Sequence, residues 1–452
     1  MIRREFIVGV FVCILTIGCA QRRADLDSAR HAFAAGDLVA AQQTLSELAD
    51  NRGPQAIPAA MDLAIVELAS GHPKAAEKRL IDLRNRFQEM PEWDGAKEAA
   101  ALVVDDRVRA YRPAGYEDVM IRAMLSICSL AGDQIDAESY ALQANMRQNK
   151  LAQQAENRGI LDASDVFQPI AMAPYLRGML REATHRDYDD AERAYQLVSS
   201  VRPQFAPASA DLARVADGVH SAPEHGVLYV LACVGRGPVL HETVAPTTSQ
   251  SLSIASAVLN REINTDEKKI GKREDEGIAL PNIASVKIPQ VVLPESDIAA
   301  LGVVVEGTLR GATQTLTDVG ELAITQLESE QPWTIARAVA RRAIKETAVA
   351  KAGDSLGLQG PAGSVFHFAA ASAWSGMEHA DTRCWGLLPR EVQVFRMELP
   401  KGTHTLNLLP LSYQGQPIAS GHNQPREIEI VDGRNTYVIA IAPSDVVYAI
   451  TR

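Results

Sequence analysis

The sequence is poor in cysteine and has no paired cysteine motif. Its 452 residues include five cysteines, no two of which stand in a CxxC arrangement: Cys13, Cys19, Cys128, Cys233 and Cys384. This spacing excludes a zinc ribbon and a dense disulfide framework, because both need closely spaced cysteines. The sequence predicts buried free thiols at the three internal positions and leaves one disulfide open as the alternative.

An excess of positive charge and a membrane-length apolar run are also missing. The chain carries 45 Lys and Arg against 56 Asp and Glu, which argues against general nucleic-acid binding because that needs a basic footprint. The N-terminal apolar run, Phe6–Ile17, is shorter than the about 20 residues of a membrane-spanning helix. With 46% hydrophobic and 22% charged residues the composition is that of a globular protein, and the length predicts two or three domains.

Familiar catalytic and metal-binding signatures are scarce. His241-Glu242 begins an HExxH pattern, but Ala245 stands where the second histidine is needed. Four residues are the nearest candidates for a metal site, and their spacing fits no standard zinc centre: His367, His379, Asp381 and Cys384. The sequence therefore predicts a protein that is not an enzyme and that holds no metal or cofactor. An enzyme with an unfamiliar site is the alternative.

The N-terminus has the layout of a secretion signal that ends at a cysteine. Arg3 and Arg4 precede the apolar run, and Leu15-Thr16-Ile17-Gly18-Cys19 closes it. This stretch resembles the lipobox of bacterial lipoproteins. The resemblance implies that residues 1–18 are a signal peptide, that the chain is cut before Cys19, and that this residue is acylated, for example with palmitate. An ordinary signal peptide with an incidental Cys19, or a spanning helix, are the alternatives.

The lipobox also sets the expected location. Several acyl chains hold a folded domain firmly at a bilayer, because each buried CH₂ contributes about 0.8 kcal/mol. The residue after the cysteine is Ala20. In such lipoproteins, a residue other than aspartate at this position favours the outer membrane. We therefore expect a protein of the cell envelope that is lipid-anchored in the outer membrane and faces the periplasm, with the membrane as one partner.

Residues 19–215 have apolar residues at helical spacing and four repeated turn motifs. Each motif has small or apolar residues 5, 9 and 12 positions after its first residue. The motifs resemble the tetratricopeptide repeat, in which a small residue lets two helices approach closely. The positions that carry the resemblance are Gly36, Ala41, Gly71, Ala76, Gly132, Ala137, Tyr188, Ala191, Tyr195 and Pro203. They predict a helical domain with a protein-binding surface, or else a scaffold that packs only against the rest of the chain.

The composition changes after the proline-rich stretch 203–226. Residues 226–234 are typical of a buried strand, and residues 317–327 and 333–351 are typical of helices, while 391–399, 403–411, 426–431 and 435–442 alternate as strands do. Lys401-Gly402 and Asp432-Gly433-Arg434 suggest hairpin turns. We therefore predict a second domain, residues 226–452, and an α+β fold whose C-terminal strands form an antiparallel meander with flanking helices.

The whole chain resembles an uncharacterised family of bacterial envelope lipoproteins with a repeat-like helical first half and a mixed second half. The resemblance is carried by four stretches, namely 235–238, 333–345, 381–389 and 399–404. It implies a shared architecture and location, and it brings no known reaction.

Two groups of residues are candidates for binding. Arg337, Arg341 and Lys345 stand four residues apart, as a basic row on one helix face would, although such rows are more often solvated or paired within the protein. Asp381, Arg383 and Trp385 lie in a distinctive stretch, either as a binding site or as a buried pair with an aromatic anchor. Trp385 together with Trp374 also raises the possibility of a small-ligand or glycan site.

Taken together, these features predict a non-catalytic, lipid-anchored scaffold or assembly factor that binds other envelope proteins. Ligand binding by the C-terminal domain is the second hypothesis. An enzyme is the third.

Overall fold

The computed structural model describes residues 23–51, 53–90, 110–160, 163–257, 285–355, 379–419 and 424–451. Helices dominate the N-terminal half of the chain and strands the C-terminal half, so the predicted α+β class is confirmed. Cys19, His367 and Trp374 lie outside the described residues.

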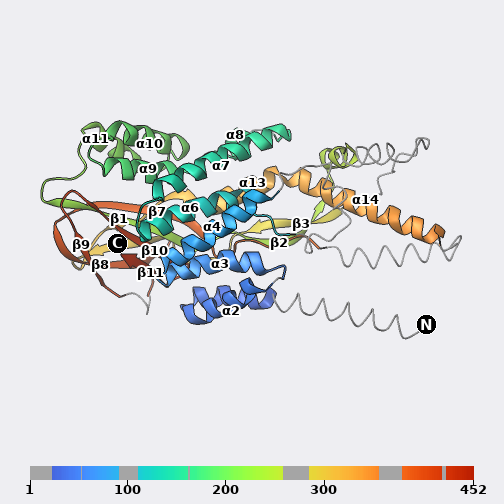
Figure 1. Ribbon diagram of the computed structural model, residues 1–452, viewed down its shortest axis with the longest axis horizontal. Coiled ribbons are helices and arrows are strands. Elements are labelled where there is room, and N and C mark those ends of the chain that lie inside the picture. Colours follow the sequence, from blue (N-terminus) through green and yellow to red (C-terminus); the bar gives the residue numbers. More distant parts are fainter. Residues whose placement is uncertain are drawn as a thin grey trace.

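Within the described residues, the N-terminal half forms four helical hairpins, each closed by a short turn (Figure 1). They pair the helix over residues 23–34 with α2 (Leu38–Asp50), α3 (Ala56–Ala69) with α4 (Pro73–Glu89), α6 (Gly115–Ala131) with α7 (Ala137–Asn157), and α9 (Met172–Glu182) with α10 (Tyr188–Val201). The short α8 (Ala163–Val166) follows α7, and α11 (Ala208–Ala216) packs on α10. From α2 onward, each hairpin contacts the next along the chain.

All four turn motifs fall at the turns inside these hairpins. The residues 5, 9 and 12 positions after each motif's start are at most 6% exposed: Ala41, Leu45, Leu48, Ala76, Leu80, Leu83, Ala137, Ala141, Ala144, Ala191, Tyr195 and Val198. Gly36 and Gly71 turn the chain with φ values of 93° and 78°, a conformation that favours glycine. Gly132 caps α6, and Pro203 follows the end of α10. The motifs therefore mark helix–helix turns and inward-facing side chains.

Gly178 shows why the fourth hairpin needs a small residue. A Cβ at this position of α9 would lie 2.7 Å from the ring of Tyr195 in α10. We expect Gly178→Ala to lower the free energy of unfolding by about 1–3 kcal/mol, because the added methyl overpacks a filled interface. Urea denaturation of the variant would measure this loss. Ser200→Ala, on the exposed side of α10, is the control, and an equal effect of both would contradict the packing.

The C-terminal half is built on a five-stranded sheet, here called the central sheet. Its strands run in the order β11 (Tyr448–Thr451), β10 (Asn435–Ala442), β1 (His225–Arg236), β7 (Pro389–Pro400) and β6 (Gln314–Asp318). β1 pairs in parallel with β10 and antiparallel with β7, and both of its faces are buried. Burial on both faces explains why residues 226–234 form an unbroken apolar run.

A four-stranded outer sheet covers one face of the central sheet, and the helices cover the other (Figure 1). The outer sheet has the order β5 (Thr308–Ala312), β4 (Ala300–Val305), β8 (Gly402–Leu411) and β9 (Arg426–Ile430). Leu228 and Val230 of β1 pack against the outer sheet, whereas Tyr229 and Leu231 pack against the helices. The fold therefore has three layers, with β1 at its centre.

The predicted antiparallel meander is wrong, although its four strands are present. β7 and β10 join the central sheet on either side of β1, while β8 and β9 pair in the outer sheet. The turns at Lys401-Gly402 and Asp432–Arg434 therefore carry the chain from one sheet to the other instead of closing hairpins. The physical reason is that β7 and β10 take the two places on either side of β1. The strands between them in the sequence, β8 and β9, therefore cannot pair with β1, and they form a second layer. Gly433 lies in the turn that leads from β9 of the outer sheet back to β10 of the central sheet. Its N–H donates to the carbonyl of His225, at the start of β1, over 2.8 Å.

The remaining elements lie beside these layers. β2 (Val239–Pro246) and β3 (Ser285–Val292) form a two-stranded ribbon, on which α14 (Gln331–Ser355) packs. α13 (Val319–Ser329) precedes α14 and contacts β7, and a helix covers residues 249–257. The helices predicted over residues 317–327 and 333–351 are thus confirmed, with ends shifted by two to four residues.

The two halves of the chain share one apolar core. Helical residues such as Phe33 and Met124 belong to the same buried cluster as Cys233 of β1 and Trp385. The division into domains 19–215 and 226–452 stays a prediction. The shared core means that the helical half buries its apolar faces against the central sheet.

Candidate functional site

An open groove lies along β11, the strand at one edge of the central sheet. It has a volume of about 420 Å³, and we call it the edge groove. It is lined by Gly36, Leu38, Ala69, Ser70, Gly71, Arg426, Val446, Val447, Tyr448, Ala449 and Ile450. The turns of the first two helical hairpins therefore form one wall, and Arg426 of the outer sheet stands on the other.

A second, smaller hollow continues the edge groove over the outer sheet. Its lining includes Leu406 and Leu408 of β8, and it shares Arg426, Val447 and Ala449 with the edge groove. The exposed lining of the two hollows is thus about equally apolar and polar, and it carries one positive charge among its described residues. This arrangement suits apolar side chains and extended main chain.

Contacts with the first helix hold β11 in place. The Tyr448 ring stacks on Phe33 with ring centroids 5.3 Å apart, and its hydroxyl donates to the Phe33 carbonyl over 2.7 Å. Ser444 donates to the carbonyl of Ala34 over 2.7 Å. Burial raises the pKa of Tyr448 to about 12, so this hydroxyl stays a neutral donor. The floor of the groove is therefore fixed before any partner arrives.

The predicted group Asp381, Arg383 and Trp385 lies elsewhere, in a segment that passes between the helices and the central sheet. Arg383 pairs with Asp381 at 2.6 Å, and its guanidinium lies over the ring of Tyr111 at 5.6 Å. Trp385 is fully buried in the core. Arg383 and Trp385 are thus buried within the protein, whereas the Asp381 side chain is 31% exposed, so the ion pair is only partly buried. We call residues 381–388 the clasp.

Three charged residues on the helices hold the clasp by its main chain. Arg30 donates to Asp62 over 2.7 Å and to the Cys384 carbonyl over 2.9 Å. Asp62 accepts from the Leu387 N–H over 2.9 Å, and Glu117 accepts from the Trp385 N–H over 2.6 Å. The side chain of Arg30 lies so close to Gly386 that a Cβ there would be 2.2 Å from it. The clasp thus ties the C-terminal half to the first three hairpins.

Burial changes the ionisation of the two helix carboxyl groups that hold the clasp, Glu117 and Asp62. It raises the pKa of Glu117 to about 7, although hydrogen bonds from Tyr111, Trp385 and Ala114 favour the charged form. Burial also raises the pKa of Asp62, against the opposing charge of Arg30. Both carboxylates were missed from the sequence. The available signal was an acidic residue on an otherwise apolar helix face, since residues four positions farther along the same face, Val66 and Ile121, are buried.

The clasp gives a pH-dependent prediction for Glu117→Gln. Because the pKa of Glu117 is about 7 in the folded protein and about 4.5 in the unfolded chain, its favourable contribution is complete below pH 4.5 and is lost as pH rises to 7. Relative to the variant, the wild-type protein should lose about 3 kcal/mol of unfolding free energy across this window. Urea denaturation at pH 4.5 and 7.5 measures the difference. Parallel pH profiles of the two proteins would contradict it.

The predicted basic row does not form a uniform exposed face. Arg341 is only 5% exposed, and Arg337 is half-buried and donates to the Thr334 hydroxyl over 3.4 Å. The side chain of Lys345 lies outside the described residues. The described part of the row therefore does not present a continuous exposed basic surface.

A second buried network, absent from the sequence-based candidates, joins the fourth hairpin to β1 and β7. Its hub is Glu182, which is fully buried and accepts from Arg214 over 2.7 and 2.9 Å and from Tyr195 over 2.9 Å. His220 lies 3.1 Å from the same carboxylate, and Arg396 3.5 Å away. Burial opposes ionisation of Glu182, but the hydrogen bonds from His220 and Arg214 lower its pKa to about 2.

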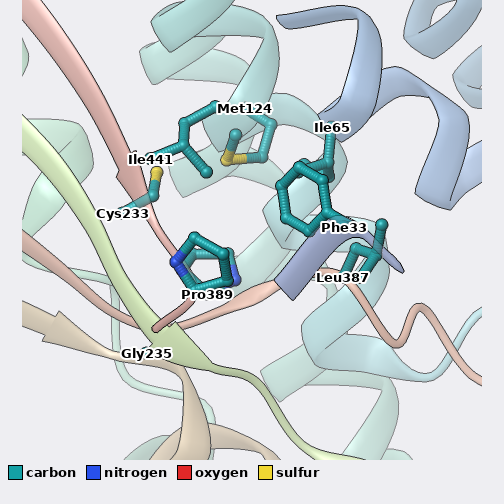
Figure 2. A pocket seen from close by; sticks show the side chains of 9 residues that line it. Phe33, Ile65, Met124, Cys233, Gly235, Leu387, Pro389 and Ile441 are labelled. Carbon is teal, nitrogen blue, oxygen red and sulfur yellow. The ribbon is translucent and has the colours of Figure 1, made fainter. Parts of the chain in front are cut away.

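The cavity nearest to the clasp is small and apolar. It lies between the first helix, α3, α6 and the central sheet, and Figure 2 shows Phe33, Ile65, Met124, Cys233 and Leu387 around it. The space open to a water-sized sphere is about 10 Å³, room for one water at most. Trp385 does not line any of the described pockets, so the ring behind the ligand hypothesis is part of a filled core.

The internal cysteines are buried as thiols, and the described metal candidates do not form a ligand cluster. Cys128, Cys233 and Cys384 are free and buried, as predicted, and burial raises the pKa of Cys384 to about 11. His379 lies 3.2 Å from Glu242, and His241 is in β2. Within the described ranges, no group of three or more His, Cys, Asp or Glu residues is placed to hold a metal ion. Nor does any helix in them have the length and apolarity to cross a membrane.

One pattern was overlooked in the sequence. Residues 353–357 read Gly-Asp-Ser-Leu-Gly and match the GxSxG motif of serine hydrolases. That motif works on a sharp turn between a strand and a helix, where the serine stands exposed. Here Ser355 is the last residue of the 25-residue helix α14, and the two residues after it lie outside the described part of the chain. The element before the serine is therefore a helix where the motif requires a strand.

Comparison of the chain with protein-family models, with curated proteins and with solved structures gives no match.

Proposed function

We propose that this protein is a non-catalytic, lipid-anchored envelope protein that binds other envelope proteins as a scaffold or assembly factor. Two features support the proposal. The lipobox-like stretch ending at Cys19 supplies the tether. The edge groove, with its mixed apolar and polar lining and its open strand edge, supplies a surface of the kind that binds protein segments.

We also propose that the four hairpins are degenerate tetratricopeptide-like repeats. The support is the common position of the buried residues after each turn, together with the close contact of Gly178 and Tyr195 in the fourth hairpin. In this proposal the hairpins serve chiefly to cover the central sheet and to place the turns at Gly36 and Gly71 beside β11.

The position of the first helix relates the tether to the groove. Only residues 20–22 separate Cys19 from the helix over residues 23–34, a reach of at most about 14 Å. The turn at Gly36 lies at the other end of that helix, about 18 Å farther along its axis. An acyl group on Cys19 would thus hold the bilayer near the start of the helix, and the edge groove would be directed away from the membrane.

The observation that carries the proposal is the edge groove itself, and cross-linking in cells tests it. A photo-reactive amino acid replaces Val39, which is 78% exposed and follows the groove residue Leu38, or Gln424, an exposed residue that lines the adjoining hollow together with Arg426. The matched control positions are Val244 of β2 and Leu309 of β5, whose side chains are 62% and 58% exposed and do not line the groove. We expect the same envelope protein to be captured from both groove positions and from neither control.

Two results would contradict the proposal. One is the absence of any captured protein at the groove positions while the chain remains folded and abundant. The other is an equal yield at the control positions, because that would mean random collision and not a binding surface.

A further inference from the structure

We infer that the edge groove takes an extended segment of a partner protein, which adds to the central sheet as a sixth strand beside β11 and brings a carboxylate to Arg426. The inference rests on the proposed function, because it names how the same groove would hold its partner. It goes beyond that proposal by fixing the conformation and the chemistry of the segment.

The first observation is the open edge of β11. Among the described residues β11 pairs only with β10, so its outer N–H and C=O groups have no protein partner. A row of unpaired main-chain groups is a template for another strand. Because β11 is pinned through Tyr448 to the first helix, the template is rigid and ordering it costs little on binding.

The second observation is that the layers on both sides extend past this edge. The lining of the edge groove comes from the hairpin turns at Gly36 and Gly71 on one side and from Arg426 of the outer sheet on the other. The consecutive residues from Val446 to Ile450 form the part between them. The groove therefore lies in the plane of the central sheet, where the next strand would run about 4.8 Å from β11.

The same overhang argues against a second copy of this chain as the occupant. Two β11 edges that paired antiparallel through a two-fold axis would bring hairpin turns against hairpin turns and outer sheet against outer sheet. The two overhanging layers would then collide before the strands came within hydrogen-bonding distance. A single extended segment has no such layers and can enter the groove.

The charge of the groove specifies the segment further. The main chain of Arg426 pairs with Leu406 in the outer sheet, while its side chain is exposed and makes no hydrogen bond or ion pair with the described residues. Around it the lining is mainly aliphatic, with Leu38 and Ile450 as examples. A strand alternates its side chains between the two faces. The segment that fits has apolar residues facing the hairpins and an acidic residue facing Arg426.

Proline variants of β11 test the main-chain part of the inference. Adjacent residues of a strand direct their N–H groups to opposite sides of it. Of Ala449 and Ile450, one therefore donates toward β10 and the other toward the groove, and proline at the second position removes only the N–H that faces the groove. The variant that keeps the wild-type melting temperature identifies that position and is the one used for binding. Arg426→Glu tests the charge, and Leu309→Pro, on the edge strand β5 of the outer sheet, is the matched control.

The probe is a displayed library of random twelve-residue peptides, selected on the full-length chain in detergent. We expect the selected peptides to alternate apolar residues and to carry an acidic residue. We also expect the folded proline variant and Arg426→Glu each to bind them about tenfold more weakly or worse, while the control binds normally. Failure to select peptides, selected peptides without this pattern, or unchanged binding to either groove variant would overturn the inference.

The cross-linking experiment separates this inference from the proposed function. If the partner captured from Val39 is captured equally well in the folded proline variant, strand addition is wrong and the scaffold role stands. If peptides bind as expected but no envelope protein is captured in cells, the groove binds strands and the scaffold role is wrong.

Discussion

A Cys19→Ser chain should leave the membrane fraction and should no longer incorporate labelled palmitate. The physical reason is that one acyl chain gives only reversible binding to a bilayer, whereas the two or more chains expected on an acylated cysteine give stable anchoring. The variant has neither. Fractionation of cells, phase separation in detergent and metabolic labelling with palmitate measure the effect.

Cys13→Ser is the matched control for this experiment. Cys13 lies in the apolar run that would be removed with the signal peptide, so its loss should change neither processing nor partitioning. If Cys19→Ser behaves as the parent does, the tether does not exist, and the compartment and the scaffold role both lose their support. If both variants lose processing, the apolar run itself was damaged and the lipobox interpretation is likewise contradicted.

Glu182→Gln should cost more stability than any other single change considered for this protein. Glu182 is fully buried and neutralises Arg214, which donates to it twice, and Arg396. Without its charge, both guanidinium groups stay buried with less compensation. Breaking a buried ion pair from one side costs about 3–5 kcal/mol. Thermal and urea denaturation of the variant at pH 7 measure the loss.

The same residue predicts acid sensitivity in a defined window. The pKa of Glu182 is about 2 in the folded protein and about 4.5 in the unfolded chain, so its stabilising contribution is present above pH 4.5 and is lost as pH falls to 2. Between pH 4.5 and 2 the wild-type protein should lose about 3 kcal/mol of unfolding free energy through this residue, and Glu182→Gln should not show that loss.

Glu156→Gln is the control for Glu182→Gln, because Glu156 is exposed on α7. A loss of stability no greater than that of the control would show that the buried network contributes little. The Glu182 window lies below pH 4.5 and the Glu117 window between pH 4.5 and 7, so the two carboxylates can be separated in one titration series.

Local spacing predicted a large part of the helical half. Residues such as Ala76 and Tyr195 were identified as inward-facing because a helix returns to the same side every three to four residues, and a turn motif fixes where that count begins. Strand existence was equally local, since alternation along residues 391–411 needs no knowledge of neighbours. The pairing of the strands does not follow from local spacing. The predicted meander was wrong because strands that are adjacent in sequence joined different sheets.

The buried charges illustrate a second limit. Asp62 and Glu117 share a helix face with apolar residues, and Glu182 stands in a polar stretch at the end of α9. In neither case does the sequence give a reason to expect a buried carboxylate instead of an exposed one. Their partners come from positions far along the chain, such as the main chain of Leu387 and the side chain of Arg396. Only folding brings these groups within hydrogen-bonding distance, and only then is burial of the charge tolerable.

By itself, the sequence determined the helical hairpins with their inward-facing residues, the α+β class and the free buried cysteines, because each depends on local spacing or on composition. The tertiary structure alone decided how strands are distributed between two sheets, that the segment around Trp385 is a structural clasp, and that an open strand edge lies under the turns at Gly36 and Gly71. These features depend on contacts between residues hundreds of positions apart, which local patterns do not encode.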